Sequence, residues 1–141
     1  MNGHIKISVL GIDNEDIQFQ VQIENYYCKT ALDFYGYADD FKRFGHKLTQ
    51  FPKSITDTVV FQLGEDDRKW AYYMFIKAFS YDASGHTALR IVVDNLGDKV
   101  NGHRSEFSII SEAASINTLG HKLLNWNPLQ TKEIVWESFT S

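Results

Sequence analysis

The chain has 141 residues, and its 43% hydrophobic content is enough to form one core in a single domain spanning residues 1–141. Its 18 acidic and 14 basic side chains give a net charge of −4 without a basic stripe, which argues against nucleic acid as a partner. Cys28 is the only cysteine, and no apolar run reaches the ~18 residues that cross a bilayer, so we expect a cytoplasmic protein with neither a disulfide nor a membrane segment.

The first clear element along the chain is a strand at residues 17–24. Apolar side chains alternate there with glutamine and glutamate, and this period of two predicts a strand with one buried face and one wet face. The face expected in the core consists of Ile17, Phe19, Val21 and Ile23. Weaker patterns predict further strands at 4–10, 27–36, 57–63 and 104–111.

A hairpin is predicted in the middle of the chain. Residues 69–79 are apolar on both faces, as in a central strand that is covered on both sides. Residues 87–93 alternate again, and the short loop 82–85 joins the two strands. We therefore expect about six or seven strands, while residues 132–139 stay open between a last strand and a docked tail.

Two short helices are predicted at about 40–51 and 115–126, where the tetrapeptide Gly-His-Lys-Leu occurs twice. Aligning Gly45 with Gly120 gives an offset of 75 residues that matches apolar positions with apolar positions. It also aligns Asp40 with Ser115, and both residue types are good N-caps. Because the match extends back into the preceding strands, the repeated unit is a strand followed by a helix.

Helix geometry favours a structural role for the tetrapeptide. At about 100° per residue, Leu48 and Leu123 fall on the apolar face, whereas His46 and His121 point to water. The glycines lie on a flank, where a missing side chain lets each helix approach the sheet. The predicted fold is α+β: a twisted, mainly antiparallel sheet with both helices packed on one face.

A rim of aromatic and acidic side chains is predicted where one strand ends and a helix begins. It consists of Tyr35, Tyr37, Asp39 and Asp40, and such a rim suits a protein partner because tyrosine is enriched at interface hot spots. The alternative is that these tyrosines only close the end of the core. We call these four residues the Tyr/Asp rim.

Asp82 and His86 bracket the hairpin loop, and a carboxylate at this spacing can orient an imidazole for acid–base chemistry. The alternative, which we favour, is an aspartate that binds its own loop backbone. The chain contains no nucleophile elbow, phosphate loop or metal-ligand motif. We therefore expect no catalytic residues, no metal and no cofactor.

The order "ALDFYGYADDFKRFGHKL", an aromatic strand, "YDASGHTALRIVVDN" and then "EAASINTLGHKLLNW" resembles small bacterial proteins of uncharacterised function. Some of these are similar to immunity proteins, which neutralise polymorphic toxins. The resemblance implies a binding role, and it transfers no catalytic residue. The net charge of −4 is consistent with a basic protein partner, such as a nuclease toxin.

Three functions from different classes remain open. The first is a non-enzymatic protein-binding module, with a homodimer also possible. The second is a small-ligand binder with a pocket between sheet and helices, lined by Trp70, Tyr72 or Tyr73. The third is an enzyme centred on Asp82 and His86, which requires hydrogen-bond reach between them or a cleft beside them.

Overall fold

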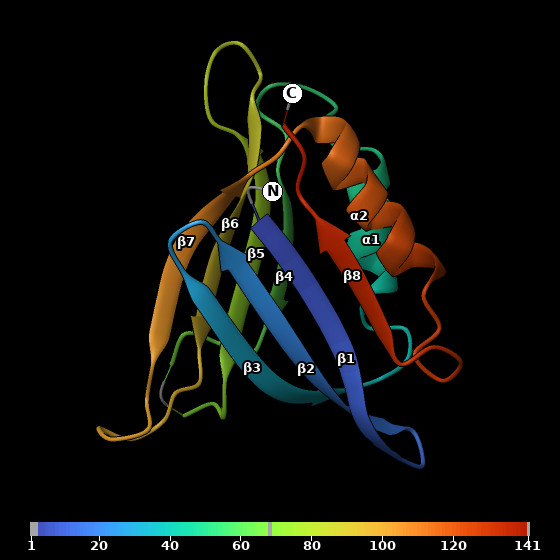
Figure 1. Ribbon diagram of the computed structural model, residues 1–141, viewed down its shortest axis with the longest axis vertical. Coiled ribbons are helices and arrows are strands. Elements are labelled where there is room, and N and C mark those ends of the chain that lie inside the picture. Colours follow the sequence, from blue (N-terminus) through green and yellow to red (C-terminus); the bar gives the residue numbers. More distant parts are fainter. Residues whose placement is uncertain (1–2, 68, 141) are drawn as a thin grey trace.

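The computed structural model describes residues 3–67 and 69–140, and it contains two antiparallel sheets and two helices (Figure 1). Sheet A contains β1 (Gly3–Asp13), β2 (Asp16–Asn25), β3 (Lys29–Gly36) and β8 (Glu133–Glu137), in the order β3-β2-β1-β8. Sheet B contains β4 (Val59–Leu63), β5 (Tyr73–Ser80), β6 (Thr87–Asp94) and β7 (Arg104–Ile110), in the order β4-β5-β6-β7. The helices are α1 (Lys42–Thr49) and α2 (Ala113–Asn125).

The two halves of the chain follow the same order of elements: three strands, a helix and a fourth strand. The three strands of each half form a meander, but the fourth strand pairs with the other half. Thus β4 borders β5, and β8 borders β1. Each sheet is completed by a strand from the opposite half.

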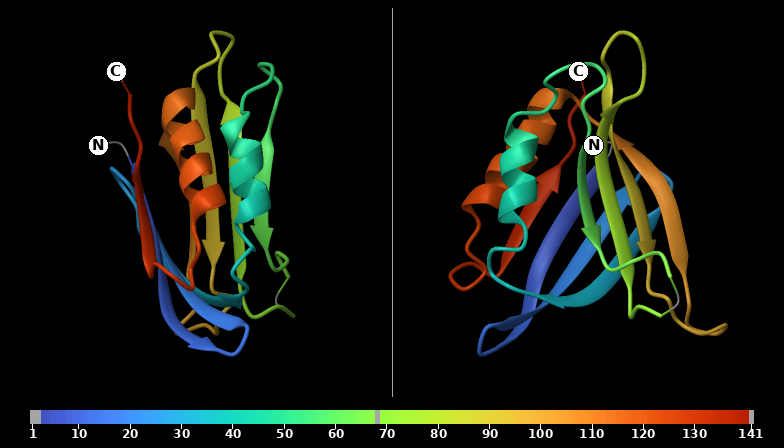
Figure 2. Two further views of the ribbon diagram at one scale, coloured as in Figure 1. Left: turned by 90° about the vertical axis from the view of Figure 1, so that its right-hand side faces the viewer. Right: turned by 180° about the vertical axis from the view of Figure 1, so that it is seen from behind.

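The prediction of a single sheet of six or seven strands is wrong, and the width that two helices can cover gives the physical reason. A helix is roughly 10 Å across, so α1 and α2 side by side cover roughly 20 Å. A face of seven paired strands would be roughly 30 Å wide, so two helices cannot cover it. The two sheets instead face each other, and the helices fill the side on which they splay apart (Figure 2).

The core lies between the inner faces of the two sheets and the helices. The predicted apolar face of β2 is confirmed, because Ile17, Phe19, Val21 and Ile23 are all fully buried. Aromatic rings fill the space next to the helices: Phe19, Phe34, Phe41, Phe61 and Trp126 contact one another in edge and stacked arrangements. All of these side chains belong to one continuous cluster.

The repeated glycines pack helix against helix, not helix against sheet as predicted. A Cβ on Gly45 would lie 2.8 Å from the Gly120 carbonyl oxygen, and a Cβ on Gly120 would lie 2.7 Å from the Gly45 oxygen. Each glycine therefore leaves room for the backbone of the other helix. The remaining predictions for the tetrapeptide are confirmed: Leu48 and Leu123 are buried, and both histidines are exposed.

Each helix also caps the end of the other. The Lys42 Nζ of α1 donates to the carbonyl oxygens of Leu124 and Trp126 at 3.1 and 3.0 Å. The Asn117 Nδ2 of α2 donates to the carbonyl oxygens of Leu48 and Phe51 at 2.8 and 2.7 Å. Lys42 and Asn117 are aligned by the offset of 75, so the two helices exchange equivalent contacts. These bonds satisfy carbonyl groups that a helix C-terminus leaves free.

The predicted N-caps are wrong. The N-cap residues of α1 and α2 are Phe41 and Glu112, and neither makes a side-chain capping bond. Asp40 accepts from the Tyr37 backbone N–H at 2.9 Å, so it stabilises the turn before α1 instead. Ser115 lies inside α2, and its hydroxyl donates to the Glu137 carbonyl at 3.3 Å. None of the helices described here has the length and apolar character to cross a membrane.

Candidate functional site

Two adjacent tyrosines are displayed on the turn between β2 and β3. Tyr26 and Tyr27 are 84% and 88% exposed, and their rings pack edge to face. The side chain of Asn25 fixes the turn, because its Oδ1 accepts from the backbone N–H groups of Tyr27 and Cys28, both at 2.8 Å. Its Nδ2 donates to the Ser108 carbonyl of β7 at 2.9 Å. The backbone that carries the two tyrosines is therefore tied to sheet B.

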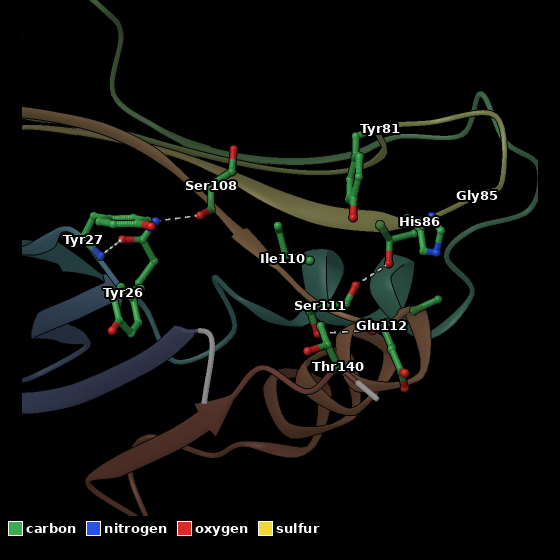
Figure 3. A pocket seen from close by; sticks show the side chains of 13 residues that line it. Tyr26, Tyr27, Tyr81, Gly85, His86, Ser108, Ile110, Ser111, Glu112 and Thr140 are labelled. Atoms are coloured by element: carbon green, nitrogen blue, oxygen red, sulfur yellow. Dashed lines mark hydrogen bonds between the residues drawn. The ribbon is translucent and has the colours of Figure 1, made fainter.

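This turn forms one wall of an open cavity of about 820 Å³, which we call the tyrosine groove. Figure 3 shows Tyr26 and Tyr27 on one side and Tyr81 with His86 on the other. Ile110 and Ser111, from the end of β7 and the residue after it, lie between the two walls. Tyr81 and Ile110 are each about half exposed, so the groove offers a mixed aromatic and polar surface.

Asp82 and His86 lie beside this groove in hydrogen-bond contact. The Asp82 Oδ2 is 2.6 Å from the His86 Nδ1, and the Asp82 Oδ1 accepts from the backbone N–H groups of Ser84 and His86. The imidazole and these N–H groups lower the pKa of the Asp82 carboxyl below its ordinary value. One carboxylate thus binds its own loop, as we favoured, and also orients the imidazole. His86 in turn stacks on Tyr81.

The Tyr/Asp rim lies at the other end of the molecule, where β3 leads into α1 (Figure 1). Tyr35 and Tyr37 are 64% and 53% exposed, so they do not simply close the core. Asp39 and Tyr37 line a smaller cavity of about 380 Å³, whereas Asp40 is engaged in the turn. The offset of 75 aligns Tyr35 with Ile110. The rim therefore lies at the β3–α1 junction, and the floor of the groove lies at the corresponding β7–α2 junction. The structure does not bring the two sites together.

A cluster of charges surrounds Arg104 at the start of β7. Its guanidinium binds both oxygens of Asp66 at 2.8 and 3.1 Å and also contacts Asp94 and Glu106. The hydrogen bond from Arg104 lowers the pKa of the Asp66 carboxyl. Burial, followed by the charge of Asp66, raises the pKa of the Tyr73 hydroxyl. Within residues 3–67 and 69–140, no group of three or more histidine, cysteine or acidic side chains is arranged to hold a metal.

Tyr26 and Tyr27 were not among the predicted site residues. The strand predicted at 27–36 includes residue 27, whereas β3 begins at Lys29. The signal was available, since asparagine favours turns and two adjacent aromatic residues after Asn25 cannot both point into the core.

The three aromatic residues suggested for a small-ligand pocket are dispersed. Trp70 is 51% exposed, Tyr73 is buried below Arg104, and the Tyr72 hydroxyl reaches the Tyr35 carbonyl at 3.4 Å. Comparison of the chain with models of known protein families, with curated proteins and with solved structures gave no match.

Proposed function

We propose that this chain is a non-enzymatic protein-binding module that docks a protein partner in the tyrosine groove. One observation carries the proposal: two almost fully exposed tyrosines lie on a turn that Asn25 pins to β7 at the wall of an open cavity. Tyrosine supplies a large contact area at a small entropic cost, and it is enriched where binding energy concentrates. A fixed turn has already lost the freedom that docking would otherwise remove.

The charge of the groove supports a basic partner. Among the described residues that line it there is neither lysine nor arginine, while Glu112 contributes a carboxylate. The His86 imidazole is paired with Asp82, and the whole chain carries a net charge of −4. Exposed tyrosine faces also attract cations. An immunity-type role, in which the chain neutralises a basic toxin, is the narrower form of this proposal.

Co-expression with the protein encoded by the neighbouring gene tests the proposal. We expect a stoichiometric complex with the wild type and its loss in the double variant Tyr26→Ser/Tyr27→Ser. The matched control is Tyr35→Ser/Tyr37→Ser, which removes two exposed tyrosines from the Tyr/Asp rim. If the wild type forms no complex, or if only the control variant loses it, the proposal is wrong.

Small-ligand binding is the second candidate, and the size of the groove supports it. A volume of about 820 Å³ lies within the range of small-molecule pockets, roughly 300–1,000 Å³. This site differs from the one predicted, because it lies between the β2–β3 turn and sheet B instead of between sheet and helices. A metabolite panel that raises the melting temperature of the wild type, but not of Tyr26→Ser/Tyr27→Ser, would favour this candidate.

A further inference from the structure

The two sheets present different outer faces to solvent. On sheet A the outward side chains of β2 are Gln18, Gln20, Gln22 and Glu24, which suits a solvated antiparallel sheet. On sheet B the outward positions of β5 and β6 include Phe75, Phe79, Ala88 and Val92. None of these four belongs to the cluster that forms the shared core. Ala88 and Val92 are 2% and 7% exposed, and Phe75 and Phe79 are partly exposed. Sheet B therefore carries apolar side chains on its outer face as well as in the core.

No further layer of the described chain covers the outer face of sheet B. The sequence predicts that residues 69–79 are covered on both sides, but both helices and sheet A lie on the inner side of sheet B, where Phe44 of α1 contacts Phe61 of β4 (Figure 2). Val60 and Ile110 add apolar surface on the flanking strands and are 44% and 49% exposed. A sheet face of this composition is typical of one that packs against a further layer.

The strand register places two unpaired cations in the middle of this face. Lys77 of β5 is directly opposite Arg90 of β6, and like charges at opposed positions destabilise a sheet. Neither side chain makes an ion pair with a carboxylate of the described residues. Arg90 reaches only the Ser108 hydroxyl at 3.4 Å, and the Lys77 ammonium lies 5.8 Å from the Phe79 ring centre. By contrast, Lys6 on the outer face of sheet A is paired with Glu133.

Negatively charged side chains lie on the same face, further along these strands. Glu106 pairs in register with Val92, which is two residues from Arg90, and Asp94 pairs with Arg104 one row further on. With Asp66, this cluster holds three carboxylates and one guanidinium, so it is negative overall. The outer face of sheet B therefore has a positive zone and a negative zone within an apolar surround.

We infer that the outer face of sheet B is a homodimer interface that a second copy of this chain covers. A two-fold axis running across the strands between the two zones would bring Lys77 and Arg90 of each copy close to the row of Phe75 and Glu106 of the other. Such an isologous contact is self-complementary in charge and buries both apolar surfaces. The negative zone opposes a phosphate backbone, so a second copy fits this face better than nucleic acid does.

Sedimentation equilibrium of the full chain over a wide concentration range tests this inference. We expect the wild type to show twice the chain mass, and Val60→Asp to reduce it to the chain mass. Val135→Asp is the matched control, because the offset of 75 aligns Val135 with Val60 and Val135 is 37% exposed. Val135 is opposite Lys6 in sheet A, just as Val60 is opposite Lys77 in sheet B. A monomeric wild type, or a dimer that only Val135→Asp disrupts, would overturn the inference.

A charge-exchange experiment tests the predicted orientation and does not depend on how well one variant folds. Arg90→Glu and Glu106→Arg should each be monomeric, because each places like charges against one another across the interface. An equimolar mixture should recover the mass of a dimer, because the mixed pair restores both attractive contacts. If the mixture stays monomeric while the wild type is dimeric, the two copies meet elsewhere. None of the substituted residues lines the tyrosine groove, so the proposed function is tested separately.

Discussion

The two strand-to-helix junctions of this protein share a framework but differ at the surface. Behind each junction, the helices exchange the same contacts: Gly45 against Gly120, and Lys42 and Asn117 each capping the other helix. In front, the junction after β3 is a turn organised by Asp40, whereas the junction after β7 opens into the tyrosine groove. The contrast indicates that the repeated residues build the fold, and the proposed binding role rests on residues that are not repeated.

The largest effect should come from the repeated leucines, which tests whether the two helices contribute equally to the core. Leu48 and Leu123 are 0% and 2% exposed, so replacing either with alanine should cost about 2–5 kcal/mol of unfolding free energy. Urea denaturation measures this loss directly. A much smaller cost at one of the two sites would show that the helices are not equivalent.

The paired glycines should be next in effect. Gly45→Ala or Gly120→Ala places a Cβ below 3 Å from backbone atoms of the other helix, and such overpacking costs about 1–3 kcal/mol. The expected loss of stability is informative, because at an open helix position the same change from glycine to alanine would raise stability by about 1 kcal/mol. Either variant proving more stable than the wild type in the same denaturation experiment would contradict the helix-to-helix contact.

The repeated histidines should have almost no effect on stability. His46 and His121 are exposed, so their replacement by alanine should change the unfolding free energy by less than about 0.5 kcal/mol. Thermal melts of the two single variants, compared with Leu48→Ala and Leu123→Ala, provide the measurement. A loss in His121→Ala as large as that in Leu123→Ala would restore a functional interpretation of the tetrapeptide.

The smallest effect concerns the ionisation of Asp82 beside the groove. Its pKa is lowered in the folded chain, so its bonds stabilise the fold above the ordinary carboxyl pKa of about 3.9 and are lost as the pH falls through the folded value. An NMR titration of the carboxyl carbon should give a midpoint below the ordinary value. In His86→Ala the midpoint should rise, and an unchanged midpoint would show that the imidazole is not the main cause.

The sequence was informative about burial and much less informative about pairing. Patterns of apolar residues located seven of the eight strands in the described part of the chain, and the apolar face of β2 is fully buried as expected. Alternation shows which side chains face a core, but it does not show which strands are neighbours. The exchange of β4 and β8 between the halves, and therefore the division into two sheets, depends on contacts between residues far apart in the chain.

In the candidate sites, too, contacts within a loop could be predicted from the sequence, whereas contacts between distant residues could not. The contact between Asp82 and His86 was predictable because the two residues are only four positions apart in a hairpin loop. The ion pair between Arg104 and Asp66 spans 38 positions and has no local signal. The tyrosine groove combines the β2–β3 turn with the hairpin and the end of β7, so only the folded chain assembles it.

The affinity for the protein encoded by the neighbouring gene, measured by calorimetry on the two tyrosine double variants, tests the central claim most directly. If binding belongs to the groove, Tyr26→Ser/Tyr27→Ser should weaken the complex about 100-fold, as expected for the loss of hot-spot side chains. Tyr35→Ser/Tyr37→Ser should leave the affinity within about twofold of the wild type, because changes away from a hot spot are nearly neutral. Equal losses in the two variants, or a loss confined to the rim variant, would contradict the account.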